Sequence, residues 1–210
     1  MSISQADSNS GQTSNTAGES EIQWFAMSAP YRRELKAKRF LDDRMVENFI
    51  PMKQTIVEKK YGIKSRELVP AIHNLIFVHT TKEKIKSLKQ GVDFLQYHTT
   101  PVNGKNTPIV VPERQMQQFI AATTAANTEI KYLHPSEIEI KKGTPVRVHG
   151  GVFDGVEGYY MKIKGKRNRT VVLLIENVTA AALTEISDGM VEILPDKKET
   201  ARKPGKAEPK

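Results

Sequence analysis

The spacing of apolar residues in the first half of the chain predicts alternating strands and helices. Residues 22–27 form a mainly apolar run that contains the only tryptophan and indicates a strand. Ala37, Phe40, Leu41 and Met45 recur at helical spacing, so we expect a helix over 32–46 with its charged residues mainly off that stripe. Residues 74–79 are apolar on both faces, which predicts a central strand or a strand whose second face meets a partner.

The remaining pattern of this half completes an α+β layout. Residues 49–52 indicate a short strand, and 54–60 with 65–69 indicate a hairpin with a basic tip. Helices are expected over 81–90 and from Pro112 onward, with a strand over 92–97 between them. This order predicts an antiparallel sheet with flanking helices.

The second half of the chain reads as a small all-β unit. Strands are expected over 146–149, 156–164, 170–175, 181–186 and 190–193. Gly150 and Gly151 can adopt positive φ at a tight turn, and Phe153 stands alone among small residues, a shape suited to plugging one end of a barrel. A basic turn is expected over 164–169.

Composition narrows the classes of function. The 210 residues include no cysteine, which excludes disulfides, thiol catalysis and thiolate zinc sites. The formal net charge of +8 favours a polyanionic partner such as nucleic acid. The five histidines lack ligand spacing, and no phosphate-loop, nucleophile-elbow or zinc-protease motif occurs, so we expect neither an enzyme nor a cofactor. No segment has the length of a membrane span and no secretory signal is evident, so we expect a cytoplasmic protein.

The same patterns divide the chain into five segments. Residues 1–20 are rich in Ser, Asn, Thr and Gly and are expected to be disordered, as is the basic segment 195–210. Between these tails we expect a first domain over 21–122, a linker over 123–139 and a second domain over 140–194.

The glycine-rich stretch of the second domain resembles the KOW motif of NusG-type transcription factors and of several ribosomal proteins. The resemblance rests on an alternating strand, a lone aromatic plug and glycines at set offsets: Val146, Val148, Gly150, Phe153, Gly155 and Gly158. It implies a five-stranded SH3-like barrel. An unrelated hairpin with glycines at its turn is the alternative.

The first half resembles the NusG N-terminal (NGN) domain. Trp24 and Phe25 open a strand before a basic helix, Ile50-Pro51-Met52 ends the next strand, and Ile109-Val110-Val111-Pro112 enters a helix. The nearest likeness is to the specialised paralogues RfaH and, above all, the UpxY antiterminators of capsular polysaccharide operons. The segment 70–75 departs from the family's usual loop before its Phe-Val strand.

This resemblance implies a monomeric regulator of transcription elongation and antitermination that binds RNA polymerase at the clamp region of its largest subunit. An apolar patch would make the contact, and the matching positions are Leu75 and Phe77, with Phe25 and Phe40 as further candidates. A simple packing role in the core is the alternative for each of the four.

Four basic residues match the region with which the specialised paralogues contact the non-template DNA strand or nascent RNA. Arg32 and Arg33 lie at the start of the first helix, and Lys86 and Lys89 lie on the second. Cations in such places neutralise phosphates, and arginine also stacks on unpaired bases. A solvated helix face is the alternative.

The second domain would be an adaptor. In general NusG proteins this domain contacts the termination factor Rho or a small-subunit ribosomal protein, and the loop around Phe153 matches that surface. A general NusG-like factor and a KOW-containing RNA-binding protein therefore stay open as alternatives to an operon-specific antiterminator.

Overall fold

A computed structural model describes residues 21–124, 130–134, 143–163, 168–183, 186 and 188–195. The tail expected over 1–20, all but the first residue of the tail expected over 195–210, and most of the basic turn, residues 164–167, lie outside the described residues.

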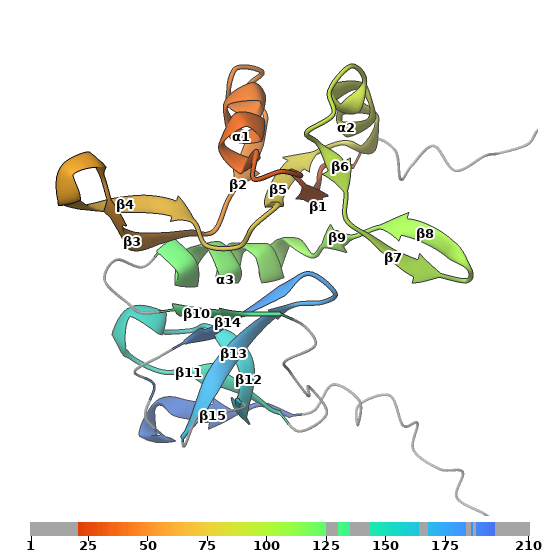
Figure 1. Ribbon diagram of the computed structural model, residues 1–210. Coiled ribbons are helices and arrows are strands. Elements are labelled where there is room, and N and C mark those ends of the chain that lie inside the picture. Colours follow the sequence, from red (N-terminus) through yellow and green to blue (C-terminus); the bar gives the residue numbers. More distant parts are fainter. Residues whose placement is uncertain are drawn as a thin grey trace, which may run out of the picture.

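The elements are stacked in layers (Figure 1). Helices α1 and α2 cover one face of a first sheet, α3 lies beneath the other face, and a second sheet lies below α3. The helices are α1 (Glu34–Asp42), α2 (Lys82–Lys89) and α3 (Glu113–Thr124). The strands of the first half are β1 (Gln23–Ser28), β2 (Glu47–Phe49), β3 (Met52–Glu58), β4 (Lys64–Pro70), β5 (Leu75–Thr80), β6 (Gln96–Tyr97), β7 (Thr99–Val102), β8 (Lys105–Pro108) and β9 (Val110–Val111).

The first sheet is antiparallel and has the order β2-β5-β1-β6, with β9 also paired to β1. In the central pair, Phe25 lies opposite Val78 and Ala26 opposite Phe77. Because successive side chains point to opposite faces, Phe25 and Val78 pack beneath α1 and α2, while Ala26 and Phe77 join the core beside α3. The expected α+β fold with a central apolar strand over 74–79 is confirmed.

Helix α1 is shorter than the apolar spacing predicts. Tyr31 and Arg32 have φ values of 61° and 56°, in the left-handed region that a right-handed helix excludes, so the helix begins only at Glu34. Its end at Asp42 leaves Met45 outside the helix and 95% exposed. The strand expected over 92–97 is likewise reduced to β6.

The second sheet contains the five strands expected from the sequence and one more. Its order is β10-β14-β13-β12-β11-β15, with the strands β10 (Ile130–Leu133), β11 (Thr144–Val148), β12 (Glu157–Lys162), β13 (Arg169–Ile175), β14 (Thr179–Leu183) and β15 (Val191–Ile193). The additional strand, β10, lies within the segment expected to be a linker and pairs with β14 over its whole length. The low apolar periodicity of 123–139 conceals it.

Helix α3 is shared by both sheets. A single cluster of buried side chains runs from Phe77 of β5 through Met116 and Phe119 of α3 to Leu173 and Ile175 of β13. Polar contacts reinforce this packing. The Gln115 side chain donates a hydrogen bond to the backbone carbonyl of Leu174, and an Arg114 guanidinium nitrogen lies 2.6 Å from a Glu157 carboxylate oxygen.

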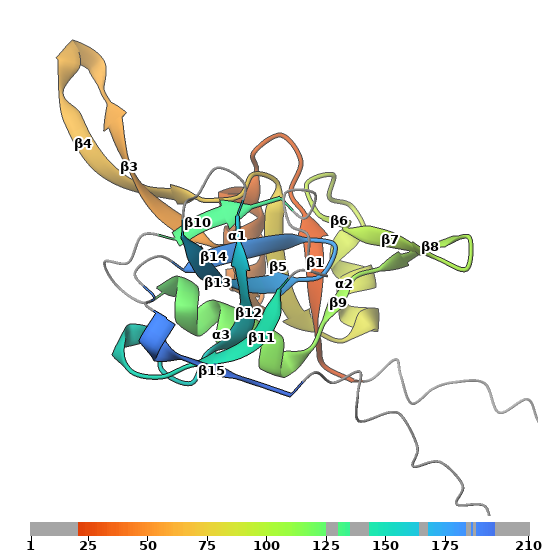
Figure 2. The same ribbon diagram turned by 90° about the horizontal axis from the view of Figure 1, so that it is seen from below.

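Two hairpins project from this body in different directions (Figure 2). The longer is β3–β4, paired from Met52–Pro70 at its base to Glu58–Lys64 near its tip, as the sequence predicts. We call residues 52–70 the arm. The shorter hairpin, β7–β8, was not expected, because most of its residues are polar or proline and lack strand alternation.

Candidate binding surfaces

Strand β5 positions two of the four residues predicted to bind RNA polymerase. Leu75 and Phe77 are 2% and 0% exposed and point toward α3. The Phe77 ring lies edge-on to Phe119 at 5.9 Å between centroids. These two side chains fill the space between the sheet and α3, so a partner cannot reach them in this conformation.

The other two predicted polymerase contacts lie on the opposite side of the first sheet. Phe25 is 3% exposed and belongs to the core beneath α1 and α2. Phe40 is only half-buried: its ring meets Phe94 edge-on at 5.4 Å, and the Arg44 guanidinium lies 3.8 Å from its centroid. Of the four, Phe40 alone offers surface to a partner.

The turn before α1 fixes the first two predicted nucleic-acid contacts. The backbone N–H of Arg32 donates to the Asn74 side-chain oxygen at 3.1 Å, and the Arg32 side chain is exposed. Arg33 is half-buried, and one of its guanidinium nitrogens lies 2.7 Å from an Asp93 carboxylate oxygen. That hydrogen bond is the main reason that the pKa of Asp93 lies below its ordinary value.

Helix α2 carries the other two predicted contacts, Lys86 and Lys89, about one turn apart. Thr81 caps the helix by accepting a hydrogen bond from the Lys84 N–H, and Ile85 and Leu88 anchor it to the sheet. Lys86 is exposed. The Lys89 ammonium lies 3.9 Å from the centroid of the Tyr97 ring, and burial lowers the pKa of Lys89.

The structure brings these basic residues onto neighbouring elements. Asp93 follows α2, so its ion pair with Arg33 ties the end of α2 to the start of α1. Both helices lie side by side on the same face of the sheet (Figure 1). We call Arg32, Arg33, Lys86 and Lys89 the α1–α2 basic surface.

A small cavity of about 280 Å³ lies between the start of α1 and the base of the arm. Arg32, Lys53 and His73 contribute basic groups to its lining. Glu34, 2% exposed, also lines it and accepts a 2.5 Å hydrogen bond from the backbone N–H of Asn74. The cavity therefore lies between Arg32 of the α1–α2 basic surface and the base of the arm.

The residues that resemble the KOW motif each have a defined place in the second sheet. Val146, Val148 and Phe153 are at most 4% exposed and belong to its core, as a plugging role for Phe153 requires. Gly150 and Gly155 have φ values of 77° and 76°, a region that side chains with a Cβ rarely adopt. Because Phe153 is buried, its exposed neighbour Val152, 65% accessible, is the apolar side chain that this loop presents.

Gly158 is required for a different reason. A Cβ at this position would lie 2.8 Å from both a Val171 methyl carbon and the Val172 carbonyl oxygen. The glycine therefore permits the close approach of β12 to β13.

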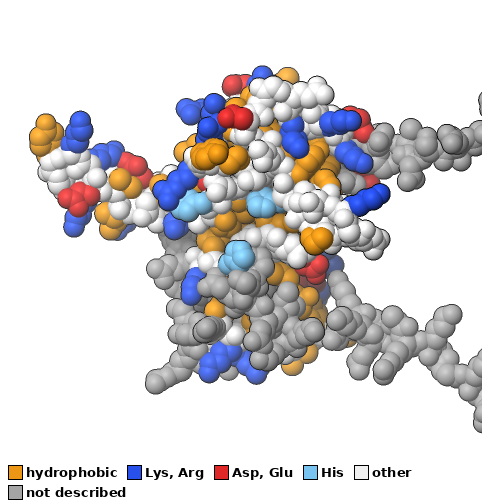
Figure 3. Space-filling view, turned by 45° about the vertical axis from the view of Figure 1, so that its right-hand side comes forward, with side chains coloured by type: hydrophobic (Ala, Val, Ile, Leu, Met, Phe, Trp, Pro, Cys, Tyr) orange, Lys and Arg blue, Asp and Glu red, His pale blue; other side chains and the backbone are white. Residues whose placement is uncertain are grey.

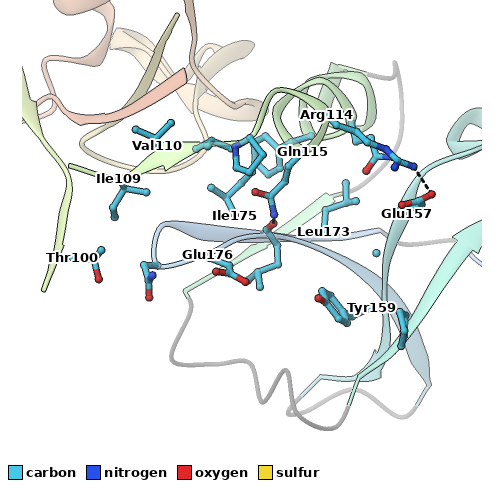
Figure 4. A pocket seen from close by; sticks show the side chains of 18 of the residues that line it. Thr100, Ile109, Val110, Arg114, Gln115, Glu157, Tyr159, Leu173, Ile175 and Glu176 are labelled. Carbon is cyan, nitrogen blue, oxygen red and sulfur yellow. Dashed lines mark hydrogen bonds and ion pairs between the residues drawn. The ribbon is translucent and has the colours of Figure 1, made fainter. Parts of the chain in front are cut away.

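An open groove of about 720 Å³ lies between α3, the neighbouring β7–β9 segment and the second sheet (Figure 4). Ile109, Val110, Leu173 and Ile175 give it apolar walls. Arg114 and Glu157 close one side through their ion pair. This groove could not be predicted from the sequence, because its walls come from segments distant along the chain.

The described residues contain no group of three or more His, Asp or Glu side chains that could hold a metal ion. In the part of the chain that the structure describes, no helix is long and apolar enough to cross a membrane.

The most exposed aromatic side chain among the described residues, Tyr61, was not predicted as a site, although its place in a basic turn is visible in the sequence.

Comparison with known proteins adds one match. No curated protein matches the chain. A family model described as "Transcription termination factor nusG" matches residues 22–120, which comprise the first sheet, α1, α2 and most of α3. Residues 22–120 of this chain are therefore similar to the NusG family.

Proposed function

We propose that this protein is a transcription elongation and antitermination factor that binds RNA polymerase through residues 22–120. The single observation that carries the proposal is the match of this segment to the NusG family. The layered α+β fold of the same residues and the net charge of +8 are consistent with it. An operon-specific role, in capsular or exopolysaccharide synthesis, rests on the resemblance of the sequence to the UpxY proteins.

The action of such a factor follows from differential binding. A protein that binds the actively elongating polymerase more tightly than its paused state shifts the population toward elongation. Residues 22–120 would supply the polymerase contact, at the clamp region of the largest subunit.

Two faces are candidates for this contact, and only one of them is accessible in the structure. Phe40 on α1 is accessible as the structure stands. Contact through Leu75 and Phe77 requires α3 or the second sheet to move away, because both side chains are buried. The polar contacts of Arg114 and Gln115 oppose that movement.

The α1–α2 basic surface would then meet the non-template strand or nascent RNA near the polymerase. Arg32 and Lys86 are exposed and suited to phosphates. Arg33 and Lys89 already contact Asp93 and Tyr97, so their part would be to shape this surface.

We propose an adaptor role for the second sheet as a KOW domain, with Rho, a ribosomal protein or RNA as its partner. The glycine positions and the exposed Val152 support this assignment. This role would apply equally to a general NusG-like factor, so the partner of this sheet separates the general from the operon-specific function.

Co-purification with RNA polymerase tests the proposal. Tagged full-length protein should retain polymerase at moderate salt. Phe40→Ala should weaken retention if α1 makes the contact, whereas Val102→Ala, which removes a 46%-exposed apolar side chain on the β7–β8 hairpin, is the matched control.

A double variant, Arg114→Ala with Gln115→Ala, separates the two faces. It should increase retention if the Leu75–Phe77 face makes the contact and leave retention unchanged if α1 does. Absence of polymerase from the wild-type sample, together with capture of RNA or ribosomal subunits, would contradict the proposal and favour a KOW-containing RNA-binding protein. If polymerase is retained, run-through of a terminator in the leader DNA tests antitermination.

A further inference from the structure

The arm extends from the body of the protein with both of its faces in solvent (Figures 1 and 2). Strands β3 and β4 form a separate two-stranded sheet that pairs with no other described strand. Isolated hairpins are at best marginally stable in water. A projecting ribbon of this length therefore contributes little to the core, which points to a role in contacting another molecule.

The tip of the arm presents Tyr61 to solvent. Its side chain is 97% exposed, and its φ of 70° lies in the left-handed region, which is uncommon for a residue other than glycine. Backbone hydrogen bonds from the Lys59 N–H to the Ile63 carbonyl and from the Gly62 N–H to the Lys59 carbonyl, at 2.8 and 3.2 Å, close the turn around it. The folded chain thus holds an aromatic ring in water without any packing partner that would explain it.

Positive charge surrounds this ring. The arm carries five cationic side chains, Lys53, Lys59, Lys60, Lys64 and Arg66, and two carboxylates, Glu58 and Glu67. One carboxylate is already paired, because the Lys59 ammonium lies 2.8 Å from a Glu67 oxygen. Figure 3 shows basic and apolar side chains gathered along the projecting arm.

The exposed apolar residues of the arm are interleaved with polar ones. Ile56 lies opposite Arg66, and Leu68 lies opposite Gln54, so each of these two exposed apolar side chains has a polar one directly across the ribbon. A protein-docking surface would instead have an apolar centre depleted of charge. Cations interspersed with a flat aromatic ring are the arrangement that binds single-stranded nucleic acid, by phosphate neutralisation and base stacking.

We propose that the tip of the arm is a binding site for single-stranded nucleic acid. One unpaired base stacks on Tyr61, while Lys60 and Lys64 neutralise the adjoining phosphates. The cavity lined by Arg32 and Lys53 places Arg32, one member of the α1–α2 basic surface, next to the base of the arm, so a strand can continue from the arm toward α1. The site needs neither polymerase nor the second sheet.

Fluorescence anisotropy with a labelled 12-nucleotide strand, as RNA and as DNA, tests this site in the full-length protein over a series of salt concentrations. Tyr61→Ala should weaken binding by roughly 5- to 150-fold, the range reported for the loss of one stacked base. Tyr61→Phe keeps the aromatic face and should bind like wild type. Lys60→Ala with Lys64→Ala should reduce the slope of log affinity against log salt by about 1.4, since each neutralised phosphate contributes about 0.7.

The matched control is Lys105→Ala, an exposed lysine on the β7–β8 hairpin. It removes one charge from the other projecting hairpin and should not change the affinity beyond a small general effect of charge. Unchanged thermal midpoints should confirm that all variants are folded.

Three outcomes would overturn the proposal. The wild type could fail to bind either strand. Tyr61→Ala could bind as tightly as Tyr61→Phe. The corresponding duplex could bind as tightly as the single strand and lose the same affinity in Tyr61→Ala. Loss of polymerase retention in the arm variants with unchanged oligonucleotide binding would assign the arm to a protein partner instead. Because the binding assay contains no polymerase, its result is independent of the proposed polymerase contact.

Discussion

Strand β5 and the arm carry similar apolar side chains in opposite environments. Leu75, Ile76, Phe77 and Val78 of β5 are at most 2% exposed. In the arm, Ile56, Tyr61, Ile63 and Leu68 are between 60% and 97% exposed. The difference lies in their neighbours: β5 is an unbroken apolar run, whereas the arm places a polar or charged residue across from Ile56 and from Leu68.

This contrast separates residues that make the fold from residues available to a partner. An unbroken apolar run predicts burial on both faces of a strand. It does not predict what covers each face, and in β5 the cover comes from α1 and α2 on one side and α3 on the other. Exposed apolar residues among charges have no such cover and mark surface that is free to bind.

The largest expected effect is at Phe77. Phe77→Ala should destabilise the protein by about 3–5 kcal/mol, because it leaves a cavity between β5 and α3. Urea unfolding followed by circular dichroism measures this, with Leu75→Met as a volume-conserving control expected to cost below about 1.5 kcal/mol. A stable Phe77→Ala protein that fails to retain polymerase would instead make β5 a binding surface and break the comparison.

Close packing, as at β5, should also determine how the second sheet responds to a substitution at Gly158. Gly158→Ala should destabilise by about 1–3 kcal/mol, since the added Cβ meets backbone as well as side-chain atoms. Gly189→Ala is the control, because its Cβ would meet nothing within 4 Å. Equal thermal midpoints for the two variants would show that β12 and β13 can separate without loss.

The arm should tolerate the truncation of a single apolar side chain, whereas β5 should not. Ile56→Ala should change the free energy of unfolding by about 0.5 kcal/mol or less, as is usual for surface positions. The same urea titration applies. A loss comparable with that of Phe77→Ala would mean that the arm packs against another part of the molecule.

The smallest effect concerns Glu67 in the arm. Hydrogen bonds from Lys59 and Ser65 hold the pKa of Glu67 below its ordinary value of 4.5. A carboxylate whose pKa is lower in the folded state stabilises the protein at pH values above its unfolded-state pKa. This contribution is lost as the pH falls through the folded-state pKa. Lys59→Gln should raise the pKa of Glu67, as measured by an NMR titration, with Lys53→Gln as the control. An unchanged pKa would show that the ion pair does not persist in solution.

Much of the fold could be predicted because local periodicity and burial agree. The runs that became β1, β5 and β13 are apolar in sequence and buried in the structure. The failures had two different causes. The left-handed backbone at Tyr31 and Arg32 shortened α1, and β10 escaped notice because its pairing with β14 depends on a distant segment.

The sequence predicts the residue types of the candidate sites better than the solvent accessibility of those residues. The turn glycines and the core role of Phe153 follow from rare backbone geometry and lone aromatic shape. Whether the core or a partner covers Leu75 and Phe77 could not be predicted, because the same apolar strand pattern is found in cores and in interfaces. Tyr61 was visible in the sequence, but its exposure depends on how far the arm projects.

Helix α3 has a consequence for how the protein melts. Its buried side chains belong to one continuous core with both sheets. We therefore expect the domains predicted over 21–122 and 140–194 to unfold together. Thermal unfolding measured by differential scanning calorimetry should show a single cooperative transition, in which the calorimetric and van't Hoff enthalpies agree.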